Sequence, residues 1–167
     1  GKTELVLNMI GYCVDYDPSP ILVMQPTDGM AQAFSKDRLA PMIRDTPVLK
    51  GKISDAKSRD SENTILHKKF PGGHITIVGA QSAAGLASRP IRILLCDEVD
   101  RYPLSAGTEG DPIKLAEKRT NTFWNRKKIY VSTPTIKGMS RIEQEYNDSS
   151  MEEWSVDCLL YTSPSPR

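Results

Sequence analysis

The tripeptide Gly1-Lys2-Thr3 has the residue types and the order that end the phosphate-binding motif G-x-x-x-x-G-K-[ST]. It stands directly before an apolar-periodic stretch that predicts a helix, which is the place that the motif requires. In such a loop the lysine contacts the β- and γ-phosphates of a nucleotide, the threonine hydroxyl ligates Mg²⁺, and the helix N-terminus adds its dipole. Because G-K-T also occurs by chance in many proteins, the tripeptide predicts a nucleotide site only together with a second motif.

The acidic pair Asp97-Glu98 supplies the second motif, because it directly follows the apolar run Ile93–Cys96. A strand that ends at this pair places Asp97 at the carboxyl edge of an α/β sheet, where its carboxylate can hold Mg²⁺. Glu98 then stands where a carboxylate can orient or deprotonate an attacking water. Acidic pairs after strands are usually solvated turn charges, but in combination with the tripeptide this pair predicts nucleotide hydrolysis.

Two further features could take part in the same chemistry. A short strand ends in the hydroxyl residues Ser132 and Thr133 before Pro134, which fits a sensor of the γ-phosphate that links hydrolysis to movement. A plain exit from a strand, ended by proline, explains them as well. Arg89 and Arg92 flank the start of the strand that leads to the acidic pair. Arg89 is a candidate for acting in trans on a neighbouring subunit's γ-phosphate or for contacting DNA, although solvated or capping arginines are commoner.

The remaining polar clusters point less clearly to a function. The basic runs Lys68-Lys69 and Arg126–Lys128 could meet phosphates, but charge runs of this length usually form a solvated face. His67 and His74 have no carboxylate or cysteine at ligand spacing, so both are interpreted as surface or packing residues.

Strands alternate with helices along the chain, which predicts an α/β fold with a mostly parallel sheet. The expected elements are a helix over 4–16, a strand over 21–24, a helix over 27–43, adjacent strands or hairpin arms over 63–70 and 74–79, a strand over 91–97, a helix over 111–123, a strand over 129–132 and a helix over 139–146. Segment 50–63 is expected to be a loop, and segment 81–89 a short helix or a loop. The second helix should bury Ala31, Phe34, Leu39 and Met42. Trp124 and Trp154 should lie in the core or in a flap.

The composition is that of one soluble globular domain. The chain has 167 residues, 22 Lys and Arg against 21 Asp and Glu, 38% hydrophobic and 26% charged residues. These values exclude collagen-like, low-complexity and disulfide-scaffold classes, and no apolar run approaches the roughly 20 residues of a membrane span. With a net charge of +1, any contact with DNA must come from local clusters. Cys13, Cys96 and Cys158 are widely spaced, which indicates a reducing compartment and argues against a zinc site.

Four stretches carry a family resemblance: Met24–Asp28, Phe34–Arg44, Leu94–Pro103, and Ser132–Pro134 before Gly138. Together they resemble the ATPase domain of the lambda-type (GpA-like) terminase large subunits of tailed phages. The resemblance covers nearly all of residues 1–157. It implies an α/β fold of the P-loop NTPase class, of the additional-strand, catalytic-glutamate type, with three layers and a mostly parallel sheet.

The resemblance also implies a role for each candidate residue, with ATP and Mg²⁺ as cofactors. Gly1, Lys2 and Thr3 would bind ATP, with Lys2 also catalytic and Thr3 also a metal ligand. Asp97 would hold the metal and Glu98 would be the catalytic carboxylate. Ser132, Thr133 and Pro134 would form the coupling motif.

In this family the whole protein hydrolyses ATP to drive viral DNA into a procapsid and cuts the DNA with a separate C-terminal nuclease domain. The implied partners are double-stranded viral DNA, the terminase small subunit, the procapsid portal and further copies of the chain in a ring. No membrane partner is expected, and the implied location is the host cell cytoplasm. Nuclease activity cannot be assigned to any residue of this chain.

Two other functions remain open on the motifs alone. A superfamily-2-like helicase, or another nucleic-acid-stimulated P-loop ATPase, shares G-K-T and D-E but would normally add helicase motifs. A nucleotide-binding scaffold without turnover is the second alternative, and Glu98 argues against it because a pure binder needs no carboxylate beside the Mg²⁺ aspartate.

Both ends of the chain are expected to be cut ends. Residues 1–157 are interpreted as a partial ATPase domain that lacks its first strand and most of its phosphate loop, so that the isolated chain should aggregate or bind ATP no better than millimolar. Residues 158–167 match in order the translation of a common transposon-end sequencing adapter, and they are interpreted as a non-native tail in which Cys158 alone is ambiguous.

Overall fold

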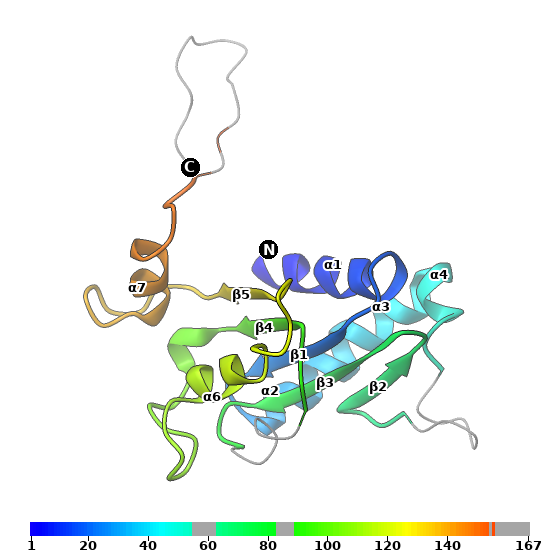
Figure 1. Cartoon of the computed structure of the whole chain (residues 1–167), viewed down its shortest axis with the longest axis horizontal. Coiled ribbons are helices and arrows are strands. Elements are labelled where there is room, and N and C mark those ends of the chain that lie inside the picture. Colours follow the sequence, from blue (N-terminus) through cyan, green and yellow to red (C-terminus); the bar gives the residue numbers. More distant parts are fainter. Residues whose placement is uncertain (55–62, 83–88, 154, 156–167) are drawn as a thin grey trace.

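The computed structural model describes residues 1–54, 63–82, 89–153 and 155 (Figure 1). Its elements are α1 (Lys2–Asp15), β1 (Pro20–Gln25), α2 (Asp28–Ala33), the π-helix η1 (Phe34–Leu39), α3 (Ala40–Asp45), α4 (Pro47–Lys50), β2 (His67–Phe70), β3 (Gly73–Gly79), β4 (Ile93–Asp97), the 3₁₀ turn η2 (Val99–Arg101), α6 (Pro112–Lys118), β5 (Lys127–Val131) and α7 (Arg141–Asn147). Trp154, the proposed tail 158–167 and most of segments 50–63 and 81–89 lie outside the described residues.

The five strands form one sheet in the order β2-β3-β1-β4-β5, so that β2 and β5 are its outermost strands (Figure 1). β1 pairs in parallel with β3 and β4, β4 pairs in parallel with β5, and β2 runs antiparallel to β3. The expected mostly parallel sheet and the hairpin of β2 and β3 are therefore confirmed. Because parallel strands point the same way, Gln25, Asp97 and Val131 end their strands along one edge of the sheet.

Both faces of the sheet are buried, which gives three layers. Side chains alternate along β1: Ile21 and Val23 pack into the hydrophobic cluster that contains α1, whereas Leu22 and Met24 pack into a second cluster that contains α6. The first cluster also includes residues of η1, α3 and α4, and the second extends to Ala106. Unbroken apolar strands such as β1 are typical of parallel sheets that are covered on both faces.

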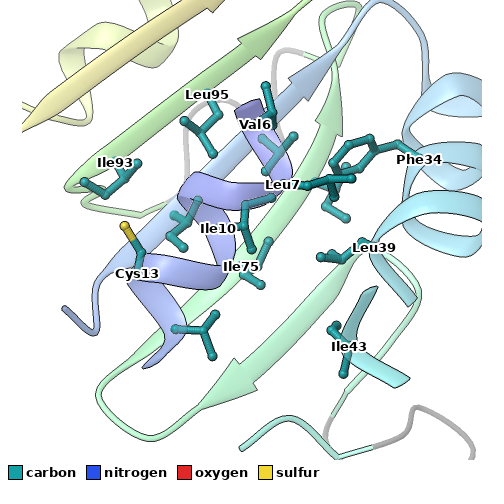
Figure 2. Close-up of a cluster of buried hydrophobic side chains, with 14 of the residues drawn as sticks. Val6, Leu7, Ile10, Cys13, Phe34, Leu39, Ile43, Ile75, Ile93 and Leu95 are labelled. Atoms are coloured by element: carbon teal, nitrogen blue, oxygen red, sulfur yellow. The ribbon is translucent and has the colours of Figure 1, made fainter. Parts of the chain in front are cut away.

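α1 packs an apolar face on the sheet, as Figure 2 shows. Its buried positions recur at every third or fourth residue, which is the spacing of one helix face: Val6, Leu7, Ile10, Cys13 and Val14. Each buried aliphatic side chain contributes roughly 1.5–3 kcal/mol. The helix ends at Asp15, shortly before Pro18. This packing holds the first turn of α1, with Lys2 and Thr3, at the carboxyl edge of the sheet.

The expected helix over 27–43 forms as three consecutive segments, α2, η1 and α3. Thr27 caps it as expected, since its hydroxyl accepts a hydrogen bond from the Met30 N–H at 3.2 Å. Ala31, Phe34 and Leu39 are buried, but Met42 is only half-buried and Ile43 is buried instead. The π-helix explains the correction, because its wider turn shifts the buried face along the sequence.

Three sequence expectations need correction in the second half of the chain. α6 ends at Lys118 rather than near 123, because the chain closes into tight turns in which the Thr120 hydroxyl donates to the Glu117 carbonyl at 2.8 Å. α7 starts after Ser140, whose hydroxyl accepts from the Glu143 N–H at 3.2 Å, and so excludes Met139. Trp124 is 91% exposed on the turn between α6 and β5, and its assignment to the core or a flap is wrong.

Candidate functional site

A cleft of about 360 Å³ opens at the carboxyl edge of the sheet. It lies between the first turn of α1, the ends of β1 and β4, and the α2–η1 segment. The residues that line it are Thr3, Gln25, Met30, Ala33, Phe34, Asp37, Arg38, Asp97, Glu98 and Arg101. The fold thus brings together Thr3 and the acidic pair, which the sequence places far apart.

Asp97 is held from one side only. Its side chain is buried, and the Gln25 amide Nε2 donates to Oδ2 at 3.2 Å. Within the described part of the chain, Oδ1 is buried without any hydrogen-bond donor. A buried carboxylate oxygen without a donor is costly unless a cation or a ligand satisfies it. An oxygen of this kind suits a hard cation such as Mg²⁺.

Glu98 has a backbone conformation that is unusual for a residue with a side chain. Its φ of 56° and ψ of 47° lie in the left-handed region. Non-glycine residues in this region store strain and are concentrated at functional sites. The turn is closed by the Arg101 N–H, which donates to the Glu98 carbonyl at 2.9 Å. Arg101 Nε lies 3.6 Å from Glu98 Oε2, so the guanidinium also faces the carboxylate.

Lys2 meets the predicted coupling motif. Its Nζ donates to the Thr133 hydroxyl at 2.8 Å, which joins the start of α1 to the loop after β5. Ser132 is buried, and its hydroxyl accepts from the Asp100 N–H at 3.2 Å. Pro134 is exposed. The three segments that the sequence singled out therefore lie together at one edge of the sheet.

Asp100 is a residue of this region that sequence reasoning missed. Its Oδ2 accepts from the Thr135 N–H at 2.9 Å and from the Thr135 hydroxyl at 3.1 Å, and its Oδ1 accepts from the Ile142 N–H at 2.9 Å. Burial alone would raise the pKa of Asp100, but these donors, together with the Ser140 hydroxyl, lower the pKa below its usual value. The sequence signal was its place as a third carboxylate, two positions after Glu98.

Gln25 and Tyr102 were also missed. Gln25 could have been noticed as a polar residue at the end of an apolar strand. Tyr102 is buried, and its hydroxyl donates to the Met24 carbonyl at 2.9 Å, which ties the turn after Glu98 to the end of β1. Burial, reinforced by nearby Cys96 and Asp97, raises the pKa of Tyr102 well above its usual value. The phenol therefore stays neutral and continues to donate at physiological pH.

The two arginine candidates lie at the opposite edge of the sheet, near the starts of the parallel strands. Arg92 donates to the Ser19 hydroxyl at 2.6 Å and to Asp17 Oδ2 at 2.7 Å, so it bridges the start of β4 to the start of β1. Arg89 is exposed, and its positive charge helps to lower the pKa of His74 at the start of β3, after burial and the charge of His67. Arg89 is thus remote from Asp97 of its own chain, and its action in trans or on DNA stays a prediction.

The histidines pack against each other, as expected for packing residues. The ring centroids of His67 and His74 are 5.5 Å apart, and both side chains are half-buried. In the part of the chain that the structure describes, no three His, Cys, Asp or Glu side chains gather to hold a metal ion. A metal site in the cleft would therefore be completed by a hydroxyl and by groups that the ligand itself brings.

These features define a mixed α/β domain whose mostly parallel sheet presents a lysine, a threonine and two carboxylates at its carboxyl edge. The family model described as "Phage terminase large subunit gpA, ATPase domain" matches residues 1–160. The chain belongs to this family of terminase ATPase domains.

Individual relatives agree with this assignment. The terminase large subunit of Enterobacteria phage P21 is 29% identical over 151 residues, which cover 90% of this chain and 24% of the relative. That of Escherichia phage lambda is 27% identical over 150 residues, covering 89% of this chain and 23% of the relative. The chain thus spans about a quarter of the length of these curated relatives.

A solved structure shares the fold. The crystal structure of the HK97 bacteriophage large terminase has a TM-score of 0.68 and 14% identity, with 89% of this chain and 30% of that chain covered. None of the helices that the structure describes has the length and apolar character to cross a membrane.

Proposed function

We propose that this chain is a P-loop NTPase of the additional-strand, catalytic-glutamate type, and that it binds and hydrolyses Mg-ATP in the cleft at the carboxyl edge. The observation that carries the proposal is the convergence of Thr3 with Asp97 and Glu98 in one cleft, next to the contact between Lys2 and Thr133. A helix N-terminus and a lysine provide the positive potential that phosphates need.

Mg²⁺ fits the side chains of this cleft. The Thr3 hydroxyl and the donor-free Oδ1 of Asp97 are the protein oxygens that would hold it, and the nucleotide's phosphates would supply further ligands. When bound, the ion would neutralise part of the charge that develops on the phosphates. Lys2 would bind the β- and γ-phosphates, and Gly1 would approach them with its backbone.

Glu98 would accept a proton from the attacking water. Its position at the rim of the cleft, with a side chain 26% exposed, allows a water to reach the carboxylate. Arg101 faces the same carboxylate and would keep it oriented before the nucleotide arrives. The contact between Lys2 and Thr133 offers a direct path from the phosphates to Ser132–Pro134, which would sense the nucleotide state.

We further propose that hydrolysis drives translocation of double-stranded viral DNA into a procapsid in the host cell cytoplasm. The names of the P21 and lambda relatives support this role. A homo-oligomeric ring, the terminase small subunit and the portal would be its partners, and Arg89 would act on a neighbouring subunit or on DNA. Arg89 is exposed and lies at the end of the sheet opposite to Asp97, so a neighbouring subunit or DNA would meet it on a different face from the cleft.

Replacement of Lys2 by alanine tests the proposal. In the full-length protein, Lys2→Ala should reduce ATP hydrolysis by several orders of magnitude, because charge stabilisation of the transferring phosphoryl group is the main catalytic contribution. Phosphate release is the measurement, and chelation of Mg²⁺ with EDTA should abolish it in the unsubstituted protein. Lys50→Ala removes an exposed lysine at the end of α4 that does not line the cleft, and this variant should hydrolyse ATP normally. Unchanged turnover in Lys2→Ala would reject the assignment of the phosphate site.

A further inference from the structure

Two segments of the chain converge on Asp100, two positions after Glu98. The carboxylate accepts both donors of Thr135, in the loop after β5, and the N–H of Ile142, in the first turn of α7. The backbone N–H of Asp100 donates to the Ser132 hydroxyl in the same loop. Asp100 therefore both accepts hydrogen bonds from the loop after β5 and donates one to it, and it also contacts α7.

Asp100 cannot move independently of the turn that carries Glu98. It lies in the middle of η2, a single 3₁₀ turn that directly follows Glu98. Val99 before it and Tyr102 after it are buried in the second hydrophobic cluster, which fixes the turn against the core. We therefore expect a displacement of the Glu98 turn to displace the hydrogen bonds of Asp100, because close-packed interiors transmit strain.

Two different segments cap the first turn of α7. Ser140 already caps α7 by accepting from the Glu143 N–H at 3.2 Å. Asp100 adds a cap from a distant segment and satisfies a second N–H of the first turn. α7 buries none of its own residues completely, and in Figure 1 it lies beyond the end of β5. Its other contacts are the hydrogen bonds from Arg141 to Asp111 Oδ1 at 2.9 Å and to the Pro103 carbonyl at 3.3 Å, and the packing of half-buried Ile142 against the second hydrophobic cluster.

We propose that Asp100 is the positioning residue that couples the turn of the catalytic carboxylate to α7. This inference rests on the proposed ATP hydrolysis at Glu98 and adds the element that the hydrolysis moves. Asp100 is not among the residues that line the cleft, and it acts by holding the Glu98 turn, the loop after β5 and α7 in one arrangement. A change at the phosphates then reaches α7 through this carboxylate.

Hydrogen exchange of the full-length protein tests the coupling. Binding of Mg²⁺ with a non-hydrolysable ATP analogue should slow amide exchange in segment 135–147 about fivefold in the unsubstituted protein. In Asp100→Asn, which replaces one acceptor oxygen by a donor, this response should fall below about twofold. The KM for ATP should stay within about twofold while kcat falls roughly tenfold, because binding and positioning are separate.

Asp111→Asn is the matched control. Asp111 also tethers α7, because its Oδ1 accepts from Arg141 at 2.9 Å, but its hydrogen bonds in the described residues go to Arg141 and Ile113 and not to the Glu98 turn. It should keep both the exchange response and kcat. Thr135→Val is a milder second variant, which removes one exposed hydroxyl donor and should weaken the response in the same direction without endangering the fold.

The outcomes separate the inference from the proposed function. A normal exchange response in both Asp100→Asn and Thr135→Val, with ATP bound and hydrolysed, would overturn the coupling role and leave the ATPase intact. Equal loss of the response in Asp111→Asn would also overturn it, since any loosening of α7 would then suffice. Failure of the unsubstituted protein to bind the analogue would reject the proposed function, and the inference with it.

Discussion

Asp97 and Glu98 face the cleft in different ways, and the difference suits different tasks. Asp97 is buried and fixed by Gln25, whereas Glu98 is partly exposed and held in a strained conformation. A fixed, buried oxygen is suited to a cation, and a carboxylate in contact with solvent is suited to a water. The residue types alone predicted these two roles. They did not predict the hydrogen bond from Gln25 that holds Asp97 or the left-handed backbone that positions Glu98.

Replacement of Gln25 by leucine should weaken the use of Mg²⁺. Leucine is of similar size but lacks the amide that holds Asp97 Oδ2, so the carboxylate loses its fixed orientation. The Mg²⁺ concentration for half-maximal ATP hydrolysis should rise roughly tenfold, as is usual for the loss of a group that orients a metal ligand. Gln32→Leu, at an exposed position of α2, is the control and should leave it unchanged. An unaltered Mg²⁺ requirement in Gln25→Leu would show that Asp97 needs no support from β1.

At the scale of elements, the strongly patterned segments could be predicted and the irregular ones could not. α1, β1, β4 and the hairpin follow from apolar spacing, since one or both faces of each are buried. The π-helix η1 and the early end of α6 depend on tertiary contacts and local side-chain hydrogen bonds, which spacing does not encode. η1 matters for the cleft, because it carries Asp37 and Arg38 to its wall.

A close approach between β3 and α2 gives a prediction about stability. A Cβ atom at Gly79 would lie 2.5 Å from the Asp28 backbone nitrogen, so Gly79→Ala should force the start of α2 away from the sheet. We expect destabilisation of about 1–3 kcal/mol, seen as a lower midpoint of thermal unfolding. Gly11→Ala is the counterpart within α1, where the added Cβ meets only Leu49 Cδ1 at 3.8 Å, and it should stabilise by about 0.5–1 kcal/mol. A neutral Gly79→Ala would mean that α2 shifts freely at the rim of the cleft.

At the scale of the molecule, the sheet order explains why distant motifs meet. β4 lies between β1 and β5, so the parallel strands bring Gln25, Asp97 and the segment after Val131 to one edge. The alternation of strands and helices predicted a mostly parallel sheet, but strand order is a long-range property that no local pattern specifies. Because β1 and β4 are parallel, Arg92 at the start of β4 lies beside the start of β1, at the end of the sheet opposite to Asp97, which its closeness in sequence to Asp97 did not suggest.

The central claim is that this cleft hydrolyses ATP with Glu98 as the base, and Glu98→Gln tests it most directly. Glutamine keeps the size of the side chain but cannot accept a proton, so Mg-ATP affinity in calorimetry should stay within a few-fold while kcat falls by roughly 10²-fold or more. Glu109→Gln, at an exposed position outside the cleft, should hydrolyse ATP normally. A comparable loss of affinity would make Glu98 a ligand of the metal instead, and an unchanged kcat would contradict the claim.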